Sequence, residues 1–215
     1  MLTLGISTSA GQLAMALGED GKLLRDLVAL PTPGGAELGN RLHHGLTTNG
    51  LNVRDIGAIL VDVGPGGTGR VRTGVAFANA LGYALGVAVR PVSSVELAGA
   101  YAWDRHQQPV IHIVKSIKGN VYAGVARGGQ SVAVEYGRLE EILPRLTSEA
   151  GDTYVVTGQF RDEALRWSRQ QERVTLVDSG SDYGDARLLV EHPEYFTARP
   201  LAFPEYARPI TEQTL

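Results

Sequence analysis

Short apolar runs separated by turn residues open the chain. Residues 2–6, 12–17 and 23–30 each have the length and apolar content of a β-strand. The polar bend at 7–11 and the turn at 19–21 separate them, and a Pro- and Gly-rich stretch at 31–35 follows. This pattern predicts three antiparallel strands at the amino terminus.

A helical pattern then replaces the strand pattern. Leu38, Leu42 and Leu46 recur every four residues within 36–49, so they share one face of a predicted helix that ends at Asn49-Gly50. Residues 56–63 form a nearly unbroken aliphatic run, which is typical of a strand buried on both faces.

A glycine-rich loop leads from this strand to a second predicted helix, residues 71–85. Small residues recur along it at Gly74, Ala78 and Gly82, so a neighbouring element can approach its backbone closely. Residues 87–92 fit another strand, and Ser93 with Glu96 has the spacing of a capping box for a helix through Tyr101.

The order of elements restarts past residue 105. Strands are predicted at 110–114, 121–126, 131–136, 153–157 and 174–177, and helices at 139–149 and 160–171. The length of 215 residues permits one domain or two small lobes. We predict two related α/β halves, residues 1–104 and 105–215.

Composition and charge narrow the classes of function. The chain is 43% hydrophobic, so it can bury a sizeable core, and its net charge of −3 supplies no cationic field for binding RNA alone. It contains no cysteine and no Asn-x-Ser/Thr sequon, and the first Lys or Arg is Lys22. No stretch is long and apolar enough to cross a membrane. We expect a cytoplasmic protein.

The loop Gly64-Pro65-Gly66-Gly67-Thr68-Gly69 has three possible readings. Its glycines match a dinucleotide-binding fingerprint, but the next strand ends at Arg90-Pro91 without the expected acidic residue. It also approaches a P-loop, but Arg70 and Val71 stand where Lys and Ser or Thr are needed. The glycines can equally serve tight strand-to-helix packing without a ligand.

Several segments taken together resemble the TsaB (YeaZ) family in order and spacing. The segments are Leu4-Gly-Ile-Ser-Thr-Ser9, Ile56-Gly-Ala-Ile-Leu-Val61, Gly64-Pro-Gly66, Val71-Arg-Thr-Gly74, Ala80-Leu-Gly-Tyr-Ala-Leu-Gly86, Val92-Ser-Ser-Val-Glu96 and, near the carboxyl end, Pro204-Glu-Tyr-Ala-Arg208. The resemblance implies an α/β fold of the actin/Hsp70 (ASKHA) type with two lobes, each a mixed sheet with flanking helices.

The resemblance also implies a function. TsaB proteins are non-catalytic partners of TsaD, which transfers a threonylcarbamoyl group to adenosine in tRNA, and a TsaE ATPase joins them. On this reading the chain has no cofactor of its own, and ATP and metal ions bind to the partner proteins. The chain contacts tRNA only as part of the complex, and by itself it forms a homodimer.

Two departures from the family pattern concern nucleotide binding. Family members carry Asp-Thr-Ser at the first hairpin, where this chain has Ser7, so a carboxylate that could organise a metal-bound phosphate is missing. The Ser-Phe-Thr-Gly that usually follows Gly-Pro-Gly is Gly67-Thr68-Gly69-Arg70 here.

The rest of the chain offers no catalytic constellation by sequence. His43 and His44 are adjacent on a helix and point about 100° apart, and His106, His112 and His192 stand alone. A Gly-x-Ser-x-Gly elbow is absent. We therefore predict no catalytic residue and no metal site.

A protein without an active site has to act through an interface. We predict that the two helices around the glycine-rich loop dock to TsaD, or to a second copy, through Leu38, Leu42, Leu46, Val75, Ala78, Asn79 and Gly82. The other candidate site residues are Gly64, Pro65, Gly66 and Arg72 in and after the glycine-rich loop, and Tyr206 and Arg208 in the carboxyl-terminal segment.

Three alternatives stay open. The leucines can pack on their own sheet. The chain can be a nucleotide-binding enzyme that uses the Gly64–Gly69 loop for ATP or NADP. It can also be a homodimeric interaction module with another partner.

Overall fold

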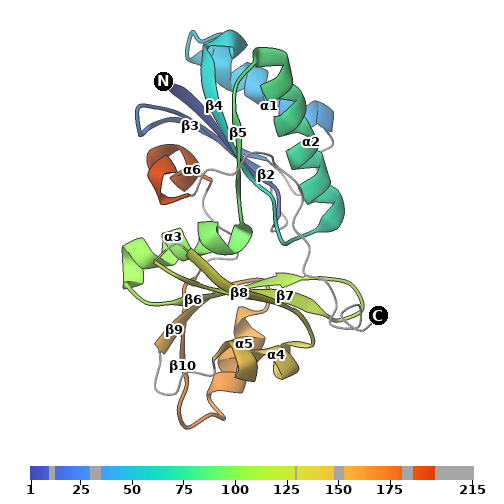
Figure 1. Cartoon of the computed structure of the whole chain (residues 1–215), viewed down its shortest axis with the longest axis vertical. Coiled ribbons are helices and arrows are strands. Elements are labelled where there is room, and N and C mark those ends of the chain that lie inside the picture. Colours follow the sequence, from blue (N-terminus) through green and yellow to red (C-terminus); the bar gives the residue numbers. More distant parts are fainter. Residues whose placement is uncertain (10–12, 30–34, 129, 148–152, 181–185, 197–215) are drawn as a thin grey trace.

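The computed structural model describes residues 1–9, 13–29, 35–128, 130–147, 153–180 and 186–196. These residues form two five-stranded mixed sheets with flanking helices, one above the other along the long axis of the molecule (Figure 1). This is the predicted two-lobed fold of the ASKHA type.

The first sheet and its helices come mostly from the first half of the chain. Its strand order is β3-β2-β1-β4-β5, antiparallel from β3 to β1 and parallel from β1 to β5. The elements of this half are β1 (Leu2–Ser7), β2 (Leu13–Glu19), β3 (Lys22–Ala29), α1 (Gly35–Thr48), η1 (Val53–Asp55), β4 (Ile56–Asp62), α2 (Thr68–Leu85), β5 (Val89–Val92) and α3 (Ser94–His106).

The second half repeats this order. The elements are β6 (Val110–Lys115), β7 (Val121–Arg127), β8 (Gln130–Gly137), α4 (Leu139–Leu146), β9 (Thr153–Gly158), α5 (Arg161–Ser168), β10 (Thr175–Asp178), α6 (Leu188–Glu191) and η2 (Pro193–Tyr195). Its sheet order, β10-β9-β6-β7-β8, is the first order read from the other edge. The prediction of two related α/β halves is confirmed at the level of topology.

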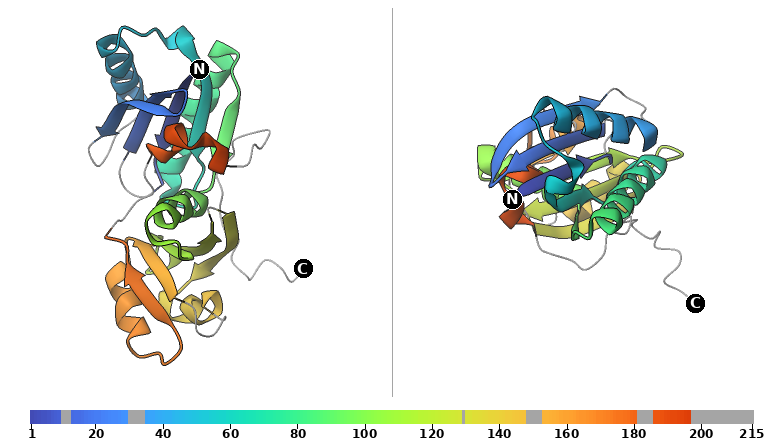
Figure 2. Two further views of the ribbon diagram at one scale, coloured as in Figure 1. Left: turned by 90° about the vertical axis from the view of Figure 1, so that its left-hand side faces the viewer. Right: turned by 90° about the horizontal axis from the view of Figure 1, so that it is seen from above.

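Each sheet is covered on both faces. Leu4 and Ile6 of β1 share a core with α1 and α2, while Gly5 between them faces Leu189 of α6. In the second sheet, Ile111 and Ile113 share a core with α4 and α5, and the other face packs against α3. Figure 2 shows α1 and α2 on one side of the first sheet and α6 on the other.

The third helix of each half therefore packs on the sheet of the other half. Helix α3 contacts β6, β7, β8 and β9, and α6 contacts β1, β2, β3 and β4. The two crossing helices meet in one apolar cluster, which includes Leu97 of α3 and Leu188 of α6. The boundary between residues 104 and 105 stays a prediction, because elements from both sides of it pack on both sheets.

Local signals placed most elements correctly. The predicted capping box is present, because Ser93 Oγ accepts from Val95 N and Glu96 Oε2 accepts from Ser93 N. The helix that it begins extends to His106, beyond the predicted end at Tyr101, and α4 ends at Leu146 instead of residue 149. Helix α6 was not predicted.

Candidate partner interface and glycine-rich loop

The three leucines of α1 lie in the core of their own lobe. Leu38, Leu42 and Leu46 are between 0% and 4% exposed and pack with the apolar face of β1, β2 and β4. This burial supports the alternative in which the leucines pack on their own sheet, and their assignment as partner contacts stays a prediction. The spacing that predicts an apolar helix face is the same whether a sheet or a partner covers that face.

One stripe of small residues on α2, formed by Gly74, Ala78 and Gly82, is also turned inward. Val75, Ala78 and Gly82 are buried, and a Cβ on Gly82 would lie 2.3 Å from Cγ2 of Val89 in β5. The small residues of this stripe therefore let α2 lie close to the sheet. Of the four α2 residues predicted at the interface, Asn79 is the one that is exposed.

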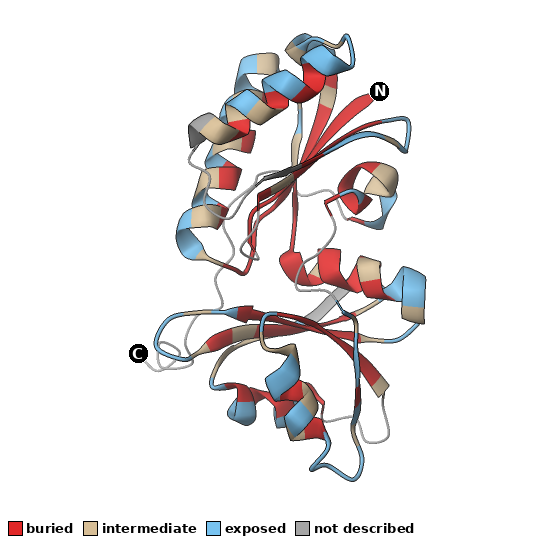
Figure 3. Cartoon of the chain, turned by 180° about the vertical axis from the view of Figure 1, so that it is seen from behind, coloured by how far each residue is buried: buried red, intermediate tan, exposed pale blue. Residues whose placement is uncertain are grey.

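The outer face of α2 carries the exposed side chains. Arg72, Ala76, Asn79 and Tyr83 follow each other at intervals of three or four residues and are all exposed, so they form one stripe. Figure 3 shows exposed, pale blue segments on the helices that cover the first sheet. Tyr83 is 93% exposed, the highest value among the exposed large apolar side chains of the described residues. Tyr83 was not predicted as an interface residue, although an aromatic residue among small ones in a helix is a visible signal.

An apolar groove lies between α1, α2 and η1. Its volume is about 340 Å³. The apolar side chains that line it are Leu42, Leu46, Leu51, Val53, Phe77 and Leu81. Phe77, Leu81, Leu51 and Val53 are partly buried, so they retain apolar surface that a partner could cover.

The glycine-rich loop packs directly on the first hairpin. Gly67 N donates to the carbonyl oxygen of Ser9 at 3.0 Å, and a Cβ on Gly66 would lie 2.6 Å from the Cβ of Ser9. Ser94 at the start of α3 donates from N to Gly64 O and from Oγ to Pro65 O, both at 2.8 Å. The reading in which the glycines serve close packing therefore has direct support.

A buried carboxylate lies where this loop meets the hairpin. Asp62, the last residue of β4, is 1% exposed and accepts from Ser7 Oγ at 2.7 Å, Ser9 Oγ at 2.6 Å and Gly64 N at 2.9 Å. Burial raises the pKa of Asp62, and the hydrogen bonds from Ser9, Ser7 and Gly64 oppose that rise. Asp62 was not predicted as a site residue, because it lies within the nearly unbroken aliphatic run at 56–63.

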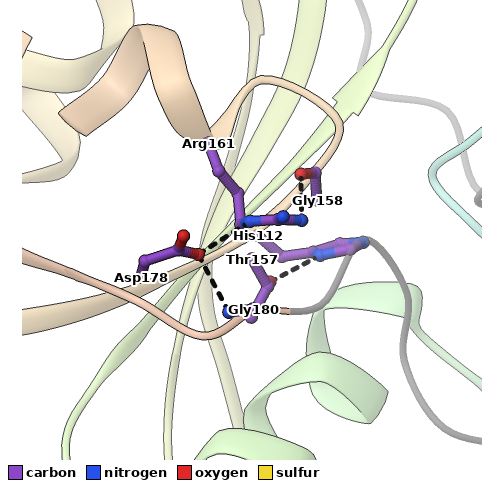
Figure 4. Close-up of polar contacts among 6 residues, drawn as sticks. All are labelled: His112, Thr157, Gly158, Arg161, Asp178 and Gly180. Carbon is purple, nitrogen blue, oxygen red and sulfur yellow. Dashed lines mark hydrogen bonds and ion pairs between the residues drawn. The ribbon is translucent and has the colours of Figure 1, made fainter. Parts of the chain in front are cut away.

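The histidines do not converge. His43 and His44 are exposed on α1, whereas His112 is buried in β6 with its Nδ1 2.8 Å from Thr157 Oγ1 (Figure 4). Burial lowers the pKa of His112 to about 4, so it is neutral at physiological pH. Within the described ranges no group of three or more His, Cys, Asp or Glu side chains could hold a metal ion.

Figure 4 also shows a polar cluster at the ends of β9 and β10. Arg161 Nε donates to Asp178 Oδ1 at 2.8 Å, and the same oxygen accepts from Gly180 N at 2.9 Å. Arg161 Nη1 also donates to Gly158 O at 3.2 Å. These bonds join the start of α5 to the end of β10, which is a structural role.

Tyr206 and Arg208 lie outside the residues that the structure describes, so their predicted role stays a prediction. In the described part of the chain, no helix combines the length and the apolar character that a membrane span requires.

Comparison with known proteins identifies the family to which the chain belongs. A family model described as TsaD, tRNA N6-adenosine threonylcarbamoyltransferase, matches residues 36–154, which is more than half of the 215 residues. The chain belongs to this family. The match begins with α1 and covers the glycine-rich loop and both helices around it.

Two solved structures share the fold over nearly the whole chain. YeaZ from Pseudomonas aeruginosa has a TM-score of 0.74 at 19% identity, with 96% of this chain and 99% of that chain covered. A structure described as an uncharacterized protein with similarity to peptidase YEAZ from Pseudomonas aeruginosa has a TM-score of 0.75 at 20% identity, with the same coverage. The chain is TsaB/YeaZ-like, as the sequence resemblance indicated.

A third structure shares the fold more distantly. An inorganic polyphosphate/ATP-glucomannokinase from Arthrobacter sp. strain KM has a TM-score of 0.55 at 11% identity, with 90% of this chain and 98% of that chain covered. At this identity the likeness concerns the fold alone.

Proposed function

We propose that this chain is a non-catalytic partner of a TsaD-like threonylcarbamoyltransferase and docks to it through the outer face of α1 and α2. The observation that carries the proposal is Tyr83, an almost fully exposed aromatic side chain on α2, the helix that also forms one wall of an apolar groove of about 340 Å³. Exposed aromatic side chains that enter a partner's surface are typical binding hot spots.

The internal hydrogen bonding of the glycine-rich loop supports a role without nucleotide. Gly64 N and Gly67 N both donate to atoms of the chain itself, so these two amides are not available to a phosphate in this arrangement. We therefore propose that ATP and metal ions belong to the TsaD-like partner and to a TsaE-like ATPase.

The remaining parts of the proposal follow from the family and the charge. With a net charge of −3, the chain would meet tRNA through the complex and not by itself. We propose that the complex works in the cytoplasm, and that the chain alone uses the same helices to form a homodimer.

The test is co-purification of the chain with the TsaD-like protein of the same organism, followed by calorimetry. Tyr83→Asp should weaken binding by about tenfold or more, because a charge replaces an aromatic contact. Ile117→Asp is the matched control, since Ile117 is 69% exposed in the other lobe and should bind like the unmodified chain. If both variants bound the TsaD-like protein with the same affinity as the unmodified chain, docking through this face of α2 would be contradicted.

A charged residue in place of Leu42 would not be a clean test, because Leu42 is 4% exposed and its replacement would disturb the core.

Calorimetry of the isolated chain with ATP and with NADP separates the proposal from the enzyme alternative. Micromolar binding of either nucleotide would favour the enzyme. An interaction module with another partner would show no affinity for the TsaD-like protein.

A further inference from the structure

The two helices of the docking face carry more positive than negative charge. Helices α1 and α2 contain three arginines, Arg41, Arg70 and Arg72, and one acidic residue, Glu37. Their formal charge is therefore +2, in a chain whose net charge is −3, so the rest of the chain carries −5. The charge of these helices is opposite in sign to that of the remaining molecule.

This positive charge is concentrated at the start of α2. Glu37 accepts from Arg41 Nε at 2.7 Å, so the charges of α1 largely cancel, whereas the 18 residues of α2 include no Asp or Glu. Arg72 is exposed on the outer stripe, and Arg70 is half-buried, with its guanidinium packed against Gly67. The partial positive charge of the helix amino terminus adds to these two cations, because no acidic side chain lies in its first turn.

The exposed aromatic side chain lies near the other end of the same helix. Tyr83 and Arg72 share the outer stripe and are about 16 Å apart along the helix axis. The start of α2 is its lower end in Figure 1, toward the second lobe. The docking face therefore has a charged end and an apolar end, which gives a partner one preferred direction along α2.

We propose that the surface that docks on this face is acidic opposite the start of α2 and apolar opposite Tyr83 and the groove. This charge pattern selects an unlike partner over a second copy. The inference rests on the proposed function, in which that partner is the TsaD-like protein. A second copy would bring the same charge of +2 to the contact, whereas an acidic surface is attracted to it.

Nucleic acid is another acidic class of partner, and two features of the face favour protein. The groove between α1, α2 and η1 is lined mainly by aliphatic and aromatic side chains, which a phosphate backbone does not cover. Two cations at one helix end would neutralise only about two phosphates, fewer than a stable complex with tRNA needs. Binding of tRNA to the isolated chain is therefore included in the test.

The first measurement is the affinity of the full chain for the TsaD-like protein of the same organism, by calorimetry at about 0.05 M and about 0.5 M NaCl. We expect the affinity of the unmodified chain to fall by about tenfold over this range, because salt screens the attraction. Arg72→Glu should bind about tenfold more weakly than the unmodified chain at the lower salt concentration. Arg72→Gln, which removes the charge and keeps a long polar side chain, should show a smaller loss in the same direction.

Arg173→Glu is the matched control for total charge. Arg173 is exposed in the other lobe, so this variant changes the net charge by as much as Arg72→Glu does, away from the docking face. It should bind within about twofold of the unmodified chain at both salt concentrations, because distant exposed charges are screened.

The second measurement needs no partner protein. Sedimentation of the isolated chain at the same two salt concentrations should show tighter self-association at the higher one, because salt screens the repulsion between two like-charged faces. Arg72→Gln should reduce this difference, since it removes one positive charge from each face.

The outcomes keep the two hypotheses apart. If the unmodified chain does not bind the TsaD-like protein at either salt concentration, the proposed function fails, and sedimentation alone decides on the charged face. Self-association that salt weakens or leaves unchanged, or that is missing at both salt concentrations, would then overturn the inference.

If the TsaD-like protein does bind, the charge pattern can still fail by itself. An affinity that does not depend on salt, or Arg72→Glu binding as tightly as Arg173→Glu, would overturn the inference and leave the proposed function in place. Micromolar binding of tRNA to the isolated chain, lost in Arg72→Glu, would assign the face to nucleic acid and overturn it as well.

Discussion

Val95 of α3 lies over Gly124 of β7, so closely that a Cβ on the glycine would be 2.6 Å from the valine Cγ2. The same hypothetical atom would be 3.0 Å from the backbone oxygen of Ala133. Gly124 therefore provides the room in which α3 crosses from its own half of the chain to the second sheet.

Gly124→Ala should lower the free energy of unfolding by about 1–3 kcal/mol, because the added methyl group overpacks the contact between helix and sheet. Urea unfolding measures the effect. Gly39→Ala in α1 is the matched control, since a Cβ there meets nothing within 4 Å. The control should raise stability by about 0.5–1 kcal/mol, as expected for alanine in a helix. The same loss in both variants would contradict this account of Gly124.

Leu38→Ala should lower the free energy of unfolding by about 2–5 kcal/mol, because Leu38 is fully buried and the substitution leaves a cavity. The folded fraction should bind the TsaD-like protein with unchanged affinity, since Leu38 does not line the groove between α1 and α2. Leu24→Ala, at a site that is 38% exposed, should cost about 0.5 kcal/mol or less. If Leu38→Ala instead lost the partner without losing stability, the original interface prediction would stand.

Buried His112 should make stability depend on pH. Its pKa falls from 6.5 to about 4 on folding, so between these values the unfolded chain binds a proton that the folded chain does not. The contribution is fully present above pH 6.5 and is lost as pH falls toward 4, by about 3 kcal/mol at most. His112→Gln should flatten this part of the curve, measured by urea unfolding from pH 7 to pH 5. His44→Gln, on the exposed face of α1, should leave its slope unchanged.

Ser93→Ala should cost about 1 kcal/mol, since it removes the acceptor for Val95 N at the start of α3. Ser93→Gly should cost only a few tenths of that, about 0.3 kcal/mol, because glycine is a tolerated N-cap residue. Thermal unfolding compares the two variants. Equal losses would mean that the hydroxyl group does not act as the cap.

Local patterns in the sequence were sufficient for most elements and for their order in both halves. The spacing of Leu38, Leu42 and Leu46 identified a helix and its apolar face, and Ser93 with Glu96 identified the start of α3. The local sequence does not show which other element covers the apolar face of a helix. The same four-residue spacing fits a sheet of the chain itself and a surface of a partner, so the structure was needed to assign the leucines to the core.

The candidate site was harder to predict than the fold. Asp62 stands in a run of aliphatic residues, and its partners Ser7 and Ser9 are more than fifty residues away in the sequence. The contact depends on the parallel pairing of β1 with β4, which no local pattern encodes. A single acid at the end of an otherwise apolar strand was the available signal. Helix α6 has four residues, too few for a periodicity to be recognised.

The crossing of α3 and α6 has a consequence for folding. One face of each sheet is covered by a helix from the opposite half of the chain, α6 on the first sheet and α3 on the second. These two helices also bury apolar side chains against each other. A fragment cut between α3 and β6 would keep α3 without the sheet that it covers, and the first sheet without α6 on one of its faces. The halves, although alike in topology, should therefore unfold together in a single cooperative transition.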